Sequence, residues 1–240
     1  MYYSPYGLGY GYGLDPTILL VLLGAAISMW ASFQVKSTYN KYARVRSASG
    51  MTGAQVAAEI LRYHGIGGVR IEHISGELTD HFDPRTRVVR LSDSTYNSTS
   101  VAAIGVAAHE IGHVIQHERG YVPIKIRAAL VPVANLGSSL GLPLVMIGFI
   151  LGMFDSLVQI GIFMFCFAVL FQVITLPVEF DASHRALVAL TEQGILSRDE
   201  VKISRKVLSA AAMTYVAAAA ASIMQLLRLI LLSNNGRRRR

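Results

Sequence analysis

The chain has 240 residues, of which 52% are apolar and only 15% are charged, and its mean hydropathy is +0.44. An average globular chain is about a quarter charged, so this composition argues against an ordinary soluble domain. The single cysteine, Cys166, excludes an internal disulfide framework and a metal site built on paired thiolates. The net charge of +7 is not accompanied by a basic helix interleaved with aromatic residues, so we expect no nucleic-acid partner.

The N-terminal part of the chain predicts one membrane-spanning helix. Residues 1–15 are rich in Gly and Tyr and contain no Lys or Arg, and we expect a flexible leader there. Residues 16–35 are uncharged and about as long as a spanning helix. Basic residues follow at once, beginning with Lys36 and Lys41. The positive-inside rule therefore places residue 36 in the cytoplasm.

Residues 36–130 form the polar part of the chain, and we expect a catalytic region there. An amphipathic helix is predicted between an N-cap at Thr52 and a stop at Gly65. Two stretches, 69–74 and 87–92, alternate apolar and polar residues, which predicts a small β-hairpin or sheet with a turn between them. An exposed strand edge beside an active site can hold an extended peptide by main-chain pairing.

The remainder of the chain alternates between apolar and polar stretches. Residues 131–178 predict a transmembrane hairpin, and residues 179–206 are polar, with a helix expected to begin after Pro177. Residues 207–232 predict a transmembrane or partly inserted helix, followed by a basic tail at 233–240. Twelve Lys and Arg lie in residues 36–130 and five in residues 179–206, which favours a cytoplasmic location for both segments. The tail, with four arginines, disagrees with a fourth span, so full and partial insertion both remain open.

A metal-binding motif, HExxH, lies in the helix that is predicted to begin near Val101. His109 and His113 are four residues apart, so they share one helix face about 6 Å apart along the axis and can converge on one ion. Glu110 lies beside the first histidine, where it can reach a water without binding the metal. This arrangement is typical of zinc peptidases, in which zinc lowers the pKa of water and the glutamate accepts its proton.

Catalytic zinc usually has three protein ligands, and the third must come from elsewhere in the chain. His117 lies two turns beyond His109, too far for all three rings to meet one ion. Arg119 occupies the position where a metzincin carries its third histidine. The predicted hairpin crosses the membrane and comes back, so Glu179, which follows it, lies on the same side of the membrane as His109. This location favours Glu179 as the third ligand. The alternative is a first-turn glutamate that stabilises a helix dipole.

The motif HEIGHVIQH, the preceding SDSTYNSTSVAAIGVAAHE and the later VEFDASHRAL and AAAMTYVAAA together resemble the YugP-type bacterial membrane zinc metallopeptidases. More distantly, the chain is similar to the HtpX and CAAX prenyl endopeptidase group of gluzincins. The resemblance covers nearly the whole chain from the first spanning helix to the last. It implies a zincin-like core with His109, His113 and Glu179 as zinc ligands and Glu110 as general base.

Several further residues are candidates for supporting roles. The HtpX group usually carries Asp four residues after its ligand Glu, whereas this chain has Ser183 there, with Asp181 only two residues after Glu179. Asp93 and Asp181 are candidate substitutes for that carboxylate. His184, Arg185 and Tyr215 are candidate donors to the oxyanion, although an interfacial basic pair and a packing tyrosine are the alternative interpretations.

The sequence therefore predicts a mainly α membrane protein with about four transmembrane helices and a zincin-like catalytic region. We expect a multi-pass protein of the cell membrane whose active site faces the cytoplasm and uses zinc. Its expected partners are the lipid bilayer and protein or peptide substrates that are membrane-associated or unfolded. The alternatives are a non-catalytic zinc-binding scaffold or assembly factor, and an intramembrane protease. The last would need HExxH within a spanning helix, yet only about eight apolar residues precede His109, far fewer than the ~20 that a span requires.

Overall fold

The computed structural model describes residues 15–238. Residues 1–14 of the predicted leader and residues 239–240 of the predicted tail lie outside the described residues. The described elements, in chain order, are α1 (Ile18–Tyr42), α2 (Gly53–Tyr63), β1 (Arg70–Ile74), β2 (His81–Asp83), β3 (Val88–Ser92), α3 (Val101–Glu118), α4 (Val122–Leu151), a π-helical turn (Phe154–Val158), α5 (Gln159–Glu192) and α6 (Arg198–Arg238). The mainly helical fold with a small sheet confirms the predicted fold class.

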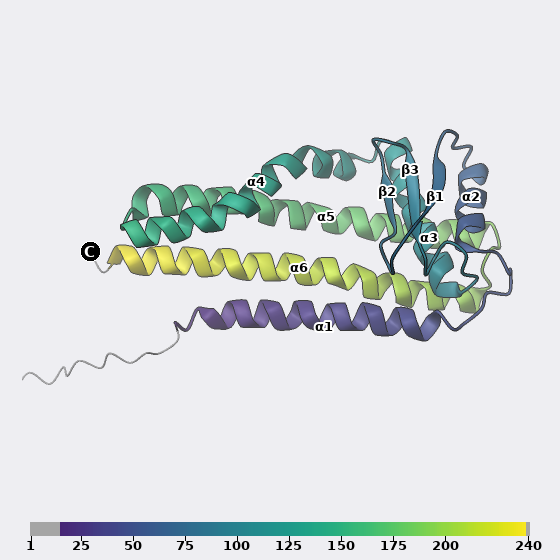
Figure 1. Ribbon diagram of the computed structural model, residues 1–240, viewed down its shortest axis with the longest axis horizontal. Coiled ribbons are helices and arrows are strands. Elements are labelled where there is room, and N and C mark those ends of the chain that lie inside the picture. Colours follow the sequence, from purple (N-terminus) through teal and green to yellow (C-terminus); the bar gives the residue numbers. More distant parts are fainter. Residues whose placement is uncertain (1–14, 239–240) are drawn as a thin grey trace, which may run out of the picture.

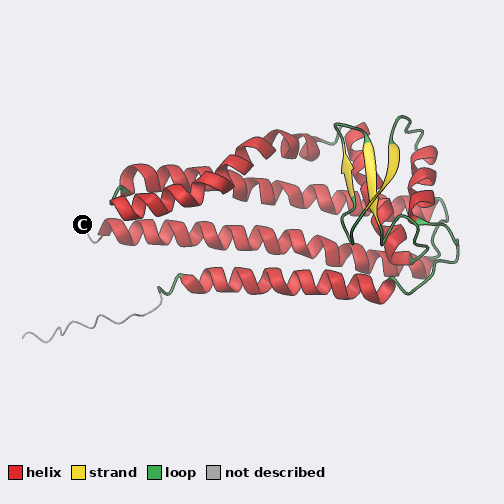
Figure 2. Ribbon diagram, viewed as in Figure 1, coloured by secondary structure: helices red, strands yellow, loops and turns green. Residues whose placement is uncertain are grey.

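Four helices are long and apolar enough to cross a membrane, as predicted: α1, α4, α5 and α6. They lie side by side, with α6 packed between α1 and α5, and with α4 against the other side of α5 (Figure 1). The sheet, α2 and α3 gather at one end, which we call the head (Figure 2). The start of α1, the turn between α4 and α5, and the end of α6 lie at the other end.

The long helices pack through small residues and leave large apolar side chains on the outside. A Cβ atom on Gly24 of α1 would lie 3.1 Å from the Cα of Ala221 on α6. A Cβ atom on Gly161 of α5 would lie 2.6 Å from the carbonyl oxygen of Gly141 on α4. Exposed side chains include Phe33 and Ile150. Close backbone approach inside and apolar bulk outside is the pattern of helices packed in lipid.

The head contains a sheet with one more strand than the sequence predicts. Its order is β1-β3-β2, with β1 parallel to β3 and β2 antiparallel to β3. The stretches 69–74 and 87–92 therefore form neighbouring strands, but they are not two arms of a hairpin. The connecting segment, which we interpreted as a turn, adds the edge strand β2. Only three residues form β2, too few for an alternating pattern to be recognised.

The helices of the head begin where the sequence predicts. The Thr52 side chain accepts a hydrogen bond from the backbone N–H of Gln55 in a capping box, and Gly65 follows α2 with a φ of 63°. The core beneath α3 consists of large aliphatic side chains, among them Ile60, Leu91 and Ile104. Polar caps and an apolar core of this kind are typical of a water-soluble domain.

The course of α5 corrects one predicted helix boundary, and α6 extends the last predicted helix. No helix begins after Pro177, because α5 continues through that residue to Glu192. Glu179 therefore lies in the interior of a long helix, which contradicts its interpretation as a first-turn residue. The last helix is a single element, α6, that runs alongside α1 to the end opposite the head (Figure 1). By length and composition it is sufficient to cross a membrane.

Candidate metal centre

Helix α3 presents the HExxH motif from a buried position at the base of the head. Its N-cap is Ser100, whose side chain accepts a hydrogen bond from the backbone N–H of Ala103. Gly112 allows α3 to approach α5 closely, because a Cβ atom there would collide with the carbonyl oxygen of Ala182. This contact brings the segment of α5 that carries Glu179 next to the motif.

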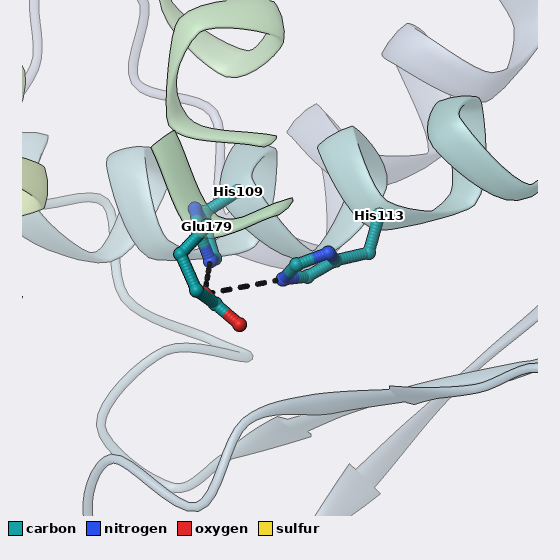
Figure 3. Close-up of side chains that lie close together, drawn as sticks. All are labelled: His109, His113 and Glu179. Carbon is teal, nitrogen blue, oxygen red and sulfur yellow. Dashed lines mark ion pairs between the residues drawn. The ribbon is translucent and has the colours of Figure 1, made fainter. Parts of the chain in front are cut away.

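The three predicted ligands lie together, from α3 and α5 (Figure 3). Oε2 of Glu179 lies 3.3 Å from Nε2 of His109 and 3.5 Å from Nε2 of His113. The Glu179 side chain is only 3% exposed, and no hydrogen-bond partner is found for its Oε2 among the described residues. A buried carboxylate oxygen without a partner is costly unless a cation satisfies it.

The donor set and its spacing fit zinc. Two imidazole nitrogens and one carboxylate oxygen form a common set of protein ligands for catalytic zinc. Ligand bonds of about 2.0–2.1 Å in a tetrahedral arrangement place neighbouring ligand atoms ~3.3 Å apart. The distances of 3.3 Å and 3.5 Å around Oε2 of Glu179 agree with that value. The three side chains can therefore hold one zinc ion and leave a fourth position open.

Contacts outside this group orient two of its members. Oγ of Ser183 lies 3.1 Å from Nδ1 of His109, on the ring atom that faces away from Glu179. Nη1 of Arg127, from the first turns of α4, lies 3.5 Å from Oε1 of Glu179. Both contacts leave the inward-facing atoms available to a metal.

Glu110 lies buried beside the two histidines, at 8% exposure, and lines the cavities on both sides of them. Burial raises the pKa of this carboxyl group, and the neighbouring His109 and His113 partly oppose the shift. A carboxylate with a raised pKa accepts a proton more readily near neutral pH. Glu110 therefore places a carboxyl group that can accept a proton directly beside the metal group.

Two cavities meet at this group. One, of about 240 Å³, is lined by Val35 of α1, by Leu208 and Ala211 of α6, and by Leu78 of the loop before β2. The other, of about 420 Å³, lies between β2 and the start of α4. Tyr215 of α6 lines both cavities, as do Asp80 and Glu179. Together the cavities form a cleft between the sheet edge and the long helices.

The predicted residues Asp181, His184 and Arg185 are not part of the metal group. Asp181 contacts Gln116, which in turn contacts His113. His184 and Arg185 line a separate cavity with His64 and Arg119.

Asp93 and His117, which the sequence also offered as polar candidates, contact residues outside the metal group. Oδ1 of Asp93 lies 2.6 Å from Nε2 of His73. The His117 ring packs edge-on against Phe82 of β2, and His117 is not part of the metal group.

Sequence reasoning missed two residues, Gln116 and Arg127. Gln116 lies three residues after His113, a spacing that places both side chains on one helix face. This spacing could have identified Gln116 as a neighbour of His113 from the sequence. Arg127 had no such signal, because its position depends on how α4 leaves the head.

Comparison with known proteins agrees with this geometry. A family described as "Putative neutral zinc metallopeptidase" matches residues 17–234. The chain is 45% identical over 200 residues to the "Putative membrane protease YugP" of Bacillus subtilis (strain 168), which covers 83% of this chain and 88% of that protein. No solved structure matches. The chain is a member of the neutral zinc metallopeptidase family.

Proposed function

We propose that the chain is a membrane-embedded zinc endopeptidase of the gluzincin type, with His109, His113 and Glu179 as zinc ligands. The observation that carries the proposal is the buried Oε2 of Glu179, which has no hydrogen-bond partner among the described residues and lies near two imidazole nitrogens. Zinc at this position would act as a Lewis acid and lower the pKa of water.

The residues of the chain then divide the reaction between them. Glu110 accepts the proton of the attacking water and returns it to the leaving amine. The Tyr215 hydroxyl, in the same cleft, donates a hydrogen bond to the oxyanion that develops on the scissile carbonyl.

Substrates of this cleft are extended segments near the membrane. The floor of the cleft consists of long helices, and the edge strand β2 lies along one wall. An extended chain can pair with that edge through its main chain, whereas a folded domain cannot. We therefore propose that the protein cleaves unfolded chains and juxtamembrane segments of other membrane proteins, in quality control or processing.

A comparison of purified wild-type protein with Glu110→Gln tests the activity. Wild type should cleave unfolded casein, lose activity with a chelator and regain it with zinc. Glu110→Gln should retain zinc and lose about 10²–10⁴-fold in rate, because only the base is removed. Glu118→Gln, on the exposed end of the same helix, is the matched control and should behave as wild type. If wild type and Glu110→Gln both bind zinc and are equally inert, the protein is a scaffold.

We further propose that the head faces the cytoplasm, because the basic residues of segments 36–130 and 179–206 lie at that end. Single cysteines at Asn97 in the head and Ser156 at the opposite end, in a Cys166→Ala background, provide the test. A membrane-impermeant thiol reagent should label Ser156→Cys in intact cells and leave Asn97→Cys unlabelled. The reverse pattern would place the active site outside.

A further inference from the structure

Gln116 is the one polar side chain of α3 that is completely buried, among the residues that the structure describes. Its amide has three partners. Oε1 lies 3.0 Å from Nδ1 of His113, and Nε2 donates hydrogen bonds to the Val178 carbonyl oxygen at 2.7 Å and to Oδ2 of Asp181 at 2.8 Å. The side chain thus joins the HExxH helix to the part of α5 that carries Glu179.

These partners determine how the amide is oriented. A carbonyl oxygen and a carboxylate oxygen only accept hydrogen bonds, so both must face the NH₂ group of Gln116. The amide oxygen is then directed at His113, and Nδ1 of that ring must be the donor. A neutral imidazole with its proton on Nδ1 has its lone pair on Nε2. Nε2 is the atom that lies 3.5 Å from Oε2 of Glu179.

Asp181 is itself held in place. Its Oδ2 also accepts a hydrogen bond at 2.6 Å from Nε of Arg185, one turn further along α5. The same carboxylate oxygen thus accepts from both Arg185 and Gln116, and this pair of contacts fixes where the Gln116 amide lies. A chain of contacts therefore runs from Arg185 through Asp181 and Gln116 to His113.

We propose that Gln116, held by Asp181, is the positioning residue that fixes the tautomer and ring orientation of His113 for metal binding. The inference rests on the proposed function, since it takes His113 to be a ligand. An amide side chain, and not a carboxylate, then contacts the ring of His113, and Asp181 acts on that ring only through Gln116. Arg185 becomes a structural residue of this chain of contacts and is no longer a candidate oxyanion donor.

Zinc affinity of the full-length protein in detergent, measured by competition with a chelator, tests the proposal without any substrate. Gln116→Met keeps the side-chain length and removes every hydrogen bond, and it should weaken zinc binding about 10–100-fold. The visible spectrum of bound Co²⁺ should change as well, because the His113 ring is free to turn. Ile115→Val is the matched control: it perturbs a neighbouring buried position on α3 and should leave affinity and spectrum unchanged.

Exchanging the amide of Gln116 with the carboxylate of Asp181 tests whether the hydrogen bonds of Gln116, and not only its packing, matter for zinc binding. Gln116→Glu alone turns an oxygen towards Asp181 and should weaken zinc binding. Combined with Asp181→Asn, it again pairs a donor with an acceptor at residue 181, although not at the Val178 carbonyl oxygen, so part of the lost affinity should return.

Wild-type affinity in Gln116→Met, an equal loss in Ile115→Val, or no recovery in the double variant would each overturn the proposal. Because these measurements involve only the metal, they can succeed even if the protein proves to have no peptidase activity.

Discussion

The head and the long helices of this protein are built on opposite principles. In the head, large aliphatic side chains such as Ile60, Leu91 and Ile104 are fully buried, and Glu110 of the candidate metal centre is a buried charged residue among them. In the long helices, small residues such as Gly161 lie inside, and side chains such as Phe33 and Ile150 are exposed. The hydrophobic effect in water accounts for the arrangement in the head, whereas close packing in lipid accounts for the arrangement in the long helices.

The candidate metal centre lies where these two regions meet. The head supplies the two histidines and Glu110, and the long helices supply Glu179 and Tyr215. A carboxylate on a membrane helix is expensive to bury without a partner, so its presence at the junction indicates a functional role. The comparison teaches that the site depends on docking of the head onto α5 and α6.

The contrast in packing predicts the largest difference between variants. Ile104→Ala should lower the free energy of unfolding by about 2–5 kcal/mol, because it leaves a cavity in the head. Ile150→Ala, on a side chain that is 79% exposed, should change it by less than about 0.5 kcal/mol in detergent. Chemical denaturation of both purified variants measures these values. Equal losses would mean that the two regions do not differ as described.

The contribution of α5 to the metal centre can be tested separately. Glu179→Ala should weaken zinc binding at least ten-fold, because it removes a proposed ligand. Glu192→Ala, at the exposed end of the same helix, is the control and should bind zinc as wild type does. Chelator competition and metal analysis give the affinity and the zinc content. Unchanged zinc binding in Glu179→Ala would exclude it as a ligand.

The smallest effect is expected on the water-exposed surface of the head. The backbone N–H of Gly76 and the His73 ring lower the pKa of Asp93. A lowered pKa in the folded state means that this contribution to stability is present above the unfolded value of ~3.9 and is lost as the pH falls further. Asp93→Asn should therefore melt slightly below wild type at about pH 5, and the difference should shrink at lower pH. A difference that grows on acidification would show that Asp93 is not held in this way.

Much of the fold and site could be predicted from local signals. The apolar stretches indicated four spanning helices, Thr52 marked the start of α2, and the spacing of His109 and His113 indicated a metal centre. Such signals depend on residues close together in sequence, which one helix or strand arranges by itself.

What was missed depends on contacts between distant segments. The edge strand β2 is defined by pairing with β3, and the passage of α5 through Pro177 is stabilised by its packing against α3 and α6. Proline usually marks a helix boundary in a soluble chain, whereas membrane helices tolerate it because neighbouring helices satisfy the freed backbone groups. Arg127 reaches Glu179 only because α4 starts beside the head.

Because α6 is uninterrupted, its length fixes the distance between the cleft and the far end of the helix. From Tyr215 in the cleft to the helix end at Arg238 are 23 residues, or about 35 Å at 1.5 Å per residue. The hydrocarbon core of a bilayer is about 30 Å thick. If the far end of α6 sits at one surface, the cleft is held at the other, within a few ångströms of the headgroups. Under the proposed function, a substrate with its own spanning helix would then be cut at a fixed short distance from where its chain leaves the membrane, whatever its sequence there.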